Sequence, residues 1–199
     1  MKIILGSQSP RRKQLLEELG YIFEVRIKET DESYPNDFKK DTIAVYIAQK
    51  KAEVLIPHLT SDELLITADT IVVLDDEVLG KPSSKENAMN MLRSLSGKTH
   101  AVISGIVVYY KGKMETDSCT TKVTFKELSD EEILHYITYH NAMDKAGAYG
   151  IQDWIGLIGV KSIEGSYTNV VGLPTYQLQE VLGRIIAKGD ESVSDDLTV

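Results

Sequence analysis

A basic cluster at an expected helix start is the first segment of the sequence that could do chemistry. Arg11, Arg12 and Lys13 follow Ser7-Gln8-Ser9-Pro10, a stretch with a serine cap and a proline suited to the first helical position. The free backbone N–H groups of a first helical turn favour an anion, whereas three cations there oppose the helix dipole. A bound polyphosphate would explain these cations, and a solvated basic helix face explains them equally well.

Carboxylates form the second candidate group. Asp69 directly follows an apolar run, and Glu29, Asp31 and Glu32 lie together in a polar loop. Carboxylates at strand ends of α/β proteins often face a ligand, and two of them brought together can hold Mg²⁺, which also bridges phosphate oxygens. Spacing alone does not show that they meet. A turn or helix-capping role is the alternative for either group.

Two lysines are candidates for phosphate binding. Lys81 lies in the constrained run Gly80-Lys81-Pro82, shortly after Asp69. Lys51 shares one helical face with three small or apolar residues, Ala44, Ala48 and Leu55. From that face a lysine either points into a pocket or extends along apolar surface to reach water.

Several other catalytic patterns are excluded. Gly97-Lys98-Thr99 does not end a Walker A loop, because position 92 is Leu92 and the expected order of helix and strand is reversed. An aspartyl-phosphate phosphatase would need an aspartate where Ile71 stands, so covalent catalysis by Asp69 is disfavoured. The four histidines lack metal-ligand spacing, and Cys119 has no recognisable base nearby.

The elements that must position these residues alternate in the first half of the chain. The pattern predicts helices at 10–19, 41–55, 84–95, 130–140 and 175–187, with capping boxes at Ser83–Glu86 and Ser129–Glu132. It predicts strands at 2–5, 21–27, 64–74, 78–79, 99–110, 114–125 and 154–163. Because long antiparallel strands dominate the middle, we expect an α/β fold with a mixed sheet.

Composition restricts the class of protein. The chain has 199 residues, 42% of them hydrophobic, with 22 Lys+Arg against 30 Asp+Glu and a net charge of −8. An acidic chain is a poor candidate for stable nucleic-acid binding, and no apolar run is long enough to cross a membrane. With a single cysteine and an apolar start too short for a signal peptide, we expect a soluble, cytoplasmic protein. Residues 190–199 read as an acidic, mobile tail.

Taken together, these segments resemble the Maf family of nucleoside triphosphate pyrophosphatases, in the right order over about residues 3–187. The matching stretches are 7–12 (SQSPRR), 47–52 (IAQKKA), 68–72 (ADTIV), 80–82 (GKP), 95–100 (LSGKTH), 144–152 (DKAGAYGIQ) and 165–174 (GSYTNVVGLP).

The resemblance implies an α/β fold with a mixed twisted sheet, flanking helices and a central nucleotide-binding cleft, as in inosine-triphosphatase-like proteins. It implies one domain over 1–189, with two lobes around the cleft, followed by the tail 190–199. The activity implied is hydrolysis of a nucleoside triphosphate to the monophosphate and pyrophosphate, with Mg²⁺ or Mn²⁺. Asp69 matches the catalytic proton acceptor. Asp69 and Glu32 match the metal positions, with Glu29 and Asp31 as alternatives to Glu32.

The resemblance also assigns substrate contacts. The residues expected to bind the substrate or to set its specificity are Ser7, Arg11, Arg12, Lys51, Thr70, Lys81 and Gln152. A glutamine at position 152 indicates the branch that prefers dTTP and UTP, and removal of surplus or modified nucleotides is the implied purpose. The family is also associated with arrest of septum formation, so a non-catalytic, nucleotide-responsive regulator of division is the alternative. The resemblance leaves open whether the protein forms a homodimer.

Overall fold

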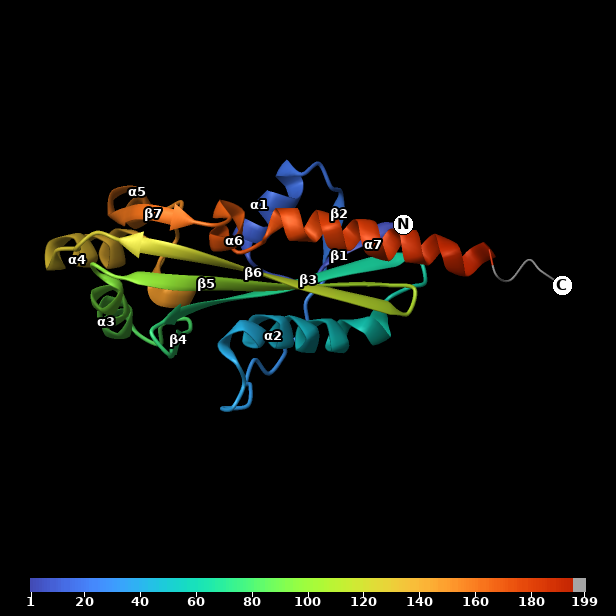
Figure 1. Ribbon diagram of the computed structural model, residues 1–199, viewed down its shortest axis with the longest axis horizontal. Coiled ribbons are helices and arrows are strands. Elements are labelled where there is room, and N and C mark those ends of the chain that lie inside the picture. Colours follow the sequence, from blue (N-terminus) through green and yellow to red (C-terminus); the bar gives the residue numbers. More distant parts are fainter. Residues whose placement is uncertain (195–199) are drawn as a thin grey trace. The chain divides into compact units, whose positions relative to one another are not determined.

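The computed structural model describes the backbone of residues 1–194 and the side chains of residues 1–187 (Figure 1). The chain divides into two compact units. The first comprises Met1–Asp69, Ser104–Cys119 and the segment that begins at Gly172, and the second comprises Thr70–Ile103 and Thr120–Val171. The predicted arrangement of two lobes around a cleft stays a prediction.

Seven strands form a mixed sheet in the order β2-β1-β3-β5-β6-β7, with β4 paired to β3. The strands are β1 Lys2–Leu5, β2 Phe23–Val25, β3 Glu63–Leu74, β4 Glu77–Leu79, β5 Thr99–Tyr110, β6 Lys113–Phe125 and β7 Val160–Glu164. β1 runs parallel to both β2 and β3, whereas the pairs β3–β4 and β6–β7 are antiparallel. The predicted α/β class with a mixed sheet is therefore confirmed.

Seven α-helices accompany this sheet in the described residues. They are α1 Pro10–Glu18, α2 Lys40–Leu55, α3 Lys85–Leu95, α4 Asp130–Tyr139, α5 Trp154–Gly159, α6 Tyr167–Val171 and α7 Thr175–Ser194, with short 3-10 turns at Ile56–His58 and Ala146–Ala148. Among the helices of this part of the chain, none has the length and apolar character needed to cross a membrane.

In the first unit, α2 lies on one face of the strands, and α1 and α7 lie on the other (Figure 1). A fully buried cluster joins α2 to the sheet, and its members are Ile4, Ala48, Ala52, Leu55, Leu65 and Val107. The helix backbone rests directly on β5, since a Cβ at Gly105 would lie 2.3 Å from the backbone nitrogen of Val45. Small residues on both sides permit this close approach.

Local capping and turn signals were predicted correctly at three places. Ser9 caps α1 and accepts the Arg12 N–H, with Pro10 at the first helical position. Ser129 and Glu132 form the predicted capping box of α4. The β5–β6 hairpin turns at Lys111-Gly112, where both residues have positive φ, as a type I′ turn requires.

The cap of α3 lies one residue later than predicted. Ser84, and not Ser83, is the capping residue, and its hydroxyl accepts the Asn87 N–H. The Asn87 side-chain oxygen in turn accepts the Ser83 N–H at 3.1 Å. The reciprocal pattern therefore forms with an asparagine in place of the expected Glu86.

The prediction of a single strand over 154–163 is wrong. Residues Trp154–Gly159 form helix α5, and only Val160–Glu164 form a strand, in which Ile163 pairs with Val123 of β6. A short apolar run fits a buried helical turn as well as a strand, and glycine weakens a strand interior. Gly156 packs so tightly that a Cβ there would lie 2.0 Å from the Ile151 carbonyl oxygen.

Two other segments end at different residues than predicted, and one helix was not predicted. β2 covers only Phe23–Val25 of the predicted 21–27, and the short helix α6 was not predicted. α7 continues to Ser194, because a lone glycine at 189 costs a helix only about 1 kcal/mol and does not end it. Of the predicted tail, residues 190–194 are thus helical and residues 195–199 lie outside the described residues.

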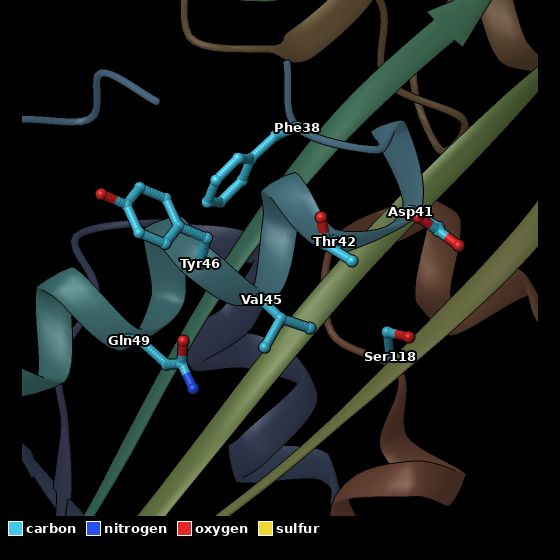
Figure 2. Close-up of a pocket in the computed structure, with 7 residues that line it drawn as sticks. All are labelled: Phe38, Asp41, Thr42, Val45, Tyr46, Gln49 and Ser118. Carbon is cyan, nitrogen blue, oxygen red and sulfur yellow. The ribbon is translucent and has the colours of Figure 1, made fainter. Parts of the chain in front are cut away.

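A groove of about 420 Å³ lies beside α2, lined by this helix, by Phe38 before it and by Ser118 of β6 (Figure 2). Phe38 and Tyr46 form one wall, with their ring centroids 4.8 Å apart in an edge-to-face arrangement. Asp41, Thr42, Val45 and Gln49 continue along the helix, and Ser118 of β6 lies opposite. None of the residues that the sequence singles out for chemistry lines this groove.

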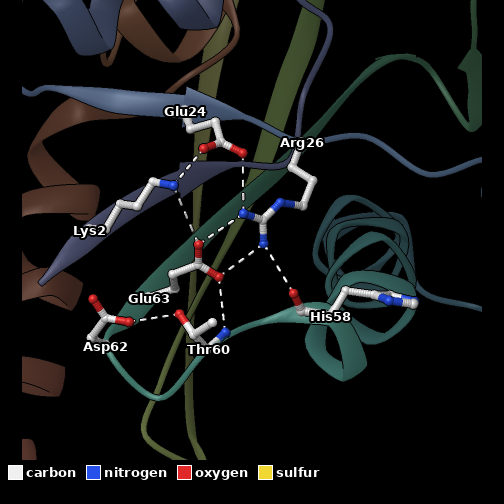
Figure 3. A network of polar contacts seen from close by, with 7 residues as sticks. All are labelled: Lys2, Glu24, Arg26, His58, Thr60, Asp62 and Glu63. Carbon is white, nitrogen blue, oxygen red and sulfur yellow. Dashed lines mark hydrogen bonds and ion pairs between the residues drawn. The ribbon is translucent and has the colours of Figure 1, made fainter.

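A network of charges ties the three N-terminal strands of the first unit together (Figure 3). Arg26 forms a two-pronged pair with Glu63, at 2.8 and 2.9 Å, and Lys2 bonds Glu24 at 2.6 Å. Glu63 is only 5% exposed. The hydrogen bonds from Arg26, followed by the Thr60 N–H, lower the pKa of Glu63 to about 2.

This network makes the stability of the folded protein depend on pH in the acidic range. Because folding lowers the pKa of Glu63 from 4.5 to about 2, its contribution is complete above pH 4.5 and is lost as the pH falls toward 2. We expect Glu63→Gln to lower the urea midpoint at pH 7, and the gap from wild type to narrow below pH 4.5. Glu53→Gln, at an exposed position of α2, serves as the control. A gap independent of pH would show that the charge of Glu63 is not what stabilises the strands.

Candidate active site

The ammonium of Lys51 lies between two carboxylates. Its Nζ atom is 2.6 Å from Oδ1 of Asp69 and 2.8 Å from Oε1 of Glu32. The side chains of Lys51 and Asp69 are 16% and 13% exposed, so this pair is largely withdrawn from water. Of the two alternatives for Lys51, the structure therefore has the inward-directed one. It also brings together the two carboxylates whose meeting the sequence left open.

The secondary structure explains why these groups meet. Asp69 lies within β3, a strand in which nearly every residue is buried, and α2 packs against that strand through its small residues. Thr67 helps to fix the contact, because its hydroxyl donates to the carbonyl of Ala48 at 2.7 Å. The face of α2 that carries the alanines is thus the one that directs Lys51 toward β3.

Glu32 and Asp31, in the acidic loop before α2, bind different partners. Glu32 reaches Lys51, whereas Asp31 bonds Lys50 at 3.0 Å and the backbone and hydroxyl of Ser33. The Ser33 and Lys50 hydrogen bonds hold the pKa of Asp31 well below its usual range. Of the three alternatives Glu29, Asp31 and Glu32, it is Glu32 that forms an ion pair with the lysine that also binds Asp69.

Arg12 is a buried cation with two well-defined acceptors. Its Nε donates to the carbonyl of Gly172 at 2.8 Å, and its Nη1 donates to Ser7 Oγ at 3.1 Å. Ser7 is itself buried and accepts a hydrogen bond from the Ser9 N–H. Arg12 therefore fastens the segment before α1 to the turn that precedes α7.

These charges act on one another electrostatically. Burial lowers the pKa of Arg12, the carboxylates of Asp69 and Glu32 oppose that shift, and the half-buried Arg11 adds to it. Arg12 and Lys51 thus both interact with the carboxylates of Asp69 and Glu32, and Arg11 adds a further positive charge beside Arg12. Such a cluster favours an anion, and its partly buried position strengthens the attraction.

The remaining predicted residues belong to the second unit. Thr70 follows Asp69 in β3 and is half-buried, whereas Lys81 and Gln152 are exposed. The loops that carry Lys81 and Gln152 are linked, since the Gly147 N–H donates to the carbonyl of Gly80 at 3.1 Å. Gln152 occupies the third position of a turn closed by a hydrogen bond from the Asp153 N–H to the Gly150 carbonyl, at 3.0 Å.

Sequence reasoning missed the residues that support this turn. Lys145 is buried and bonds Asp144 at 2.8 Å and Asp153 at 3.3 Å, and the hydroxyl of Tyr136 donates to Asp153 at 2.7 Å. A lysine within the small-residue run Asp144-Lys145-Ala146-Gly147-Ala148 was the available signal. Nothing in the sequence pointed to Tyr136, which lies on α4.

The carboxylate pair suits a hard divalent cation. In the described part of the chain, no group of three or more His, Cys, Asp or Glu side chains is placed to hold a metal. Mg²⁺ usually takes only one or two protein carboxylates and completes its shell with water and substrate phosphates. Asp69 and Glu32, which already converge on one cationic nitrogen, meet that requirement.

Comparison with known proteins agrees with the resemblance. The family described as Maf-like protein matches residues 2–185. A dTTP/UTP pyrophosphatase of Phocaeicola vulgatus is 51% identical over 185 residues, covering 92% of this chain and 96% of the relative. Proteins of the same name from Parabacteroides distasonis and Bacteroides thetaiotaomicron are 50% and 48% identical, covering 91% and 92% of this chain and 94% and 96% of their own lengths.

Two solved structures are more distantly similar. A nucleoside-triphosphatase, or dITP/XTP pyrophosphatase, of Mycobacterium abscessus is 17% identical with a TM-score of 0.40, covering 64% of this chain and 76% of its own. The Ham1 protein of Staphylococcus aureus is 14% identical with a TM-score of 0.46, covering 65% and 73%. Both scores lie below 0.5, so neither likeness carries an argument about this chain.

The contacts of Arg12 predict a loss of stability that is measurable without substrate. We expect Arg12→Met to lower the free energy of unfolding by about 1–3 kcal/mol, because the buried carbonyl of Gly172 loses its donor. Lys13→Met, at the neighbouring half-buried position of α1, should change it by less than about 0.5 kcal/mol. Urea unfolding followed by circular dichroism measures both. Equal effects of the two substitutions would mean that the Arg12 bonds do not hold the fold.

Proposed function

The chain belongs to the Maf family, and on that premise we propose that it hydrolyses nucleoside triphosphates, dTTP and UTP above all, to the monophosphate and pyrophosphate. One observation of the structure carries the proposal: Lys51 gathers Asp69 and Glu32 into a partly buried cluster that also interacts with Arg12. The names of relatives that are about half identical over nearly the whole chain support the choice of substrates.

The cations of the chain bind the triphosphate. Arg11, Lys51 and Lys81 neutralise phosphate oxygens, and charge stabilisation together with positioning supplies most of the rate in such reactions. Ser7 and Arg12 hold the segment that opens α1, because the Arg12 guanidinium donates to the Ser7 hydroxyl and Ser9 caps the helix. Because Lys51 is a compact point charge with three donors, it can exchange a carboxylate for a phosphate oxygen without moving its backbone.

Asp69 is the general base. A water molecule attacks the α-phosphorus, and its oxygen forms the new P–O bond while the bond from the α-phosphorus to the bridging oxygen breaks. Asp69 accepts the proton that the water loses, and pyrophosphate leaves with the electron pair of the broken bond. In the free protein Asp69 is bonded to Lys51, so engagement of Lys51 by phosphate frees its oxygen for this role.

Asp69 and Glu32 would hold Mg²⁺ or Mn²⁺ by their carboxylate oxygens. When bound, such an ion neutralises charge on the phosphates and on the departing pyrophosphate. Lys51 holds the two carboxylates close together, which prepares the donor pair.

Gln152, Thr70 and Arg11 distinguish the substrates. The amide of Gln152 offers one donor group and one acceptor, which suits the alternating O4, N3–H and O2 edge of thymine or uracil. Its exposed position at the tip of a turn leaves the amide accessible to a ligand. A purine would leave these polar groups imperfectly paired, at a cost in binding.

A substrate survey tests the proposal directly. Every common nucleoside triphosphate would be incubated with the protein and Mg²⁺ or Mn²⁺, and phosphate would be measured with and without added inorganic pyrophosphatase. We expect signal only with pyrophosphatase present, and most of it from dTTP and UTP. Phosphate release without that enzyme, or a preference for purine nucleotides, would contradict the proposal.

Substitutions of Asp69, Glu32 and Asp31 test the proposed catalytic roles. Asp31, the neighbour of Glu32 in the acidic loop, is the control for loss of a negative charge alone. We expect Asp69→Asn to lower the rate by about 10²–10⁴-fold, as for loss of a general base. Glu32→Gln should also lose most activity, whereas Asp31→Asn should keep it, because Asp31 bonds Lys50 and not Lys51. If Asp69→Asn kept more than about a tenth of the rate, or if Asp31→Asn lost as much as Glu32→Gln, these assignments would be wrong.

The role of Gln152 predicts an effect on selectivity. Gln152→Leu keeps roughly the volume and removes the amide, so we expect kcat/KM for dTTP and UTP to fall far more than any residual activity on dGTP. Discrimination between dTTP and UTP should stay within about 10–200-fold, because those bases differ by one methyl group. A uniform loss over all bases would show that Gln152 supports its loop without reading the base.

A further inference from the structure

One hydroxyl group holds both ends of the turn that carries Gln152. The phenol of Tyr136 donates a hydrogen bond to Oδ2 of Asp153 at 2.7 Å and accepts one from the backbone N–H of Gly150 at 3.2 Å. Gly150 and Asp153 are the first and last residues of the turn, and Gln152 lies between them. All of these residues, like α4, belong to the second unit.

The surroundings of Tyr136 keep its hydroxyl protonated, so it remains the donor to Asp153 and the acceptor from Gly150. Tyr136 is fully buried, and burial together with the Asp153 hydrogen bond raises the pKa of its phenol well above the usual value. The phenol therefore stays protonated and always has a proton to donate to Asp153. Lys145 pairs with the same carboxylate oxygen, at 3.3 Å, so a second side chain holds Asp153 in place.

The turn has no room to shift toward its support. A Cβ on Gly150 would lie 2.6 Å from Oδ2 of Asp153 and 2.9 Å from Cε of Lys145. Residue 150 is therefore pressed against the carboxylate that Tyr136 and Lys145 hold. A further bond, between the hydroxyl of Tyr149 and Nε2 of His100 at 2.7 Å, anchors the residue before the turn.

Gln152 itself is exposed, so packing against neighbours does little to restrict its side chain. A long, flexible side chain discriminates between base edges only if its backbone is fixed, because each free torsion adds alternative hydrogen-bond partners. We propose that Tyr136 is a positioning residue for base selectivity, which it exerts by holding Gly150 and Asp153 on either side of Gln152. This inference rests on the proposed function, in which Gln152 reads the base.

Tyr136→Phe tests the inference, with Tyr139→Phe as the matched control on the same helix. Phenylalanine keeps the buried ring and removes only the hydroxyl, whereas the Tyr139 side chain is 73% exposed and its recorded ring contact is with His135. We expect Tyr136→Phe to lower the ratio of kcat/KM for dTTP to that for dGTP by about 5–30-fold, mainly through KM for dTTP. Tyr139→Phe should leave the ratio within about twofold of wild type.

The double variant Tyr136→Phe/Gln152→Leu shows whether Tyr136 acts through Gln152. With the amide already absent, loss of the hydroxyl should change the selectivity ratio by less than about twofold. Additive effects, an unchanged ratio in Tyr136→Phe, or an equal loss on every nucleotide would overturn the inference. The last outcome would show that the hydroxyl serves folding alone.

The measurements on wild type and on Tyr136→Phe distinguish failure of the proposed function from failure of this inference alone. A wild-type protein without preference for dTTP and UTP would overturn the proposed function and this inference together, whereas normal wild-type preference with an unaltered Tyr136→Phe ratio overturns only the inference. If circular dichroism shows that Tyr136→Phe does not fold, Asp153→Ala decides by the same ratio, because it removes the other end of the bond. A ratio unchanged in folded Asp153→Ala would then overturn the inference.

Discussion

The charged groups of the first unit are arranged around the ion triplet of Glu32, Lys51 and Asp69. Without the ammonium of Lys51, two carboxylates this close together would repel each other. The contact in turn requires α2 to lie close to β3, which the alanines of α2 and the absence of a Cβ at Gly105 allow. A bulkier residue at this interface would displace the lysine as well as the helix.

The buried Arg12 adds a second constraint of the same kind. Breaking a buried ion or its hydrogen bonds is costly, so such groups persist where their partners are fixed. Here the partners are the carbonyl of Gly172 and the hydroxyl of Ser7, which join two segments about 160 residues apart in the sequence. The same guanidinium also interacts with Asp69 and Glu32. A residue that holds the backbone thus also sets the charge balance of the cluster.

Local signals predicted most of the fold, and failures occurred where the local pattern fits more than one structure. Caps, turn residues and hydrophobic periodicity located β1, α1, α2, the β5–β6 hairpin and α4. The run 154–163 was ambiguous by itself, and only its packing against Ile151 and its pairing with β6 separate helix α5 from strand β7. In the same way, pattern alone could not show that α7 continues past Gly189.

The site shows the same division. Motifs singled out Asp69, Lys51 and Gln152 as candidates, but they could not choose among the three carboxylates of the acidic loop. The choice follows from helix geometry: neighbouring lysines on α2 point about 100° apart, so Lys50 takes Asp31 while Lys51 takes Glu32. The sequence did not indicate Tyr136, because it lies on a separate helix, 14 residues before the turn that it holds. The charged cluster and the turn of Gln152 therefore have separate supports, one built on α2 and β3 and the other on α4. A change around α4 can therefore alter the turn of Gln152 without removing any contact of Glu32, Lys51 and Asp69.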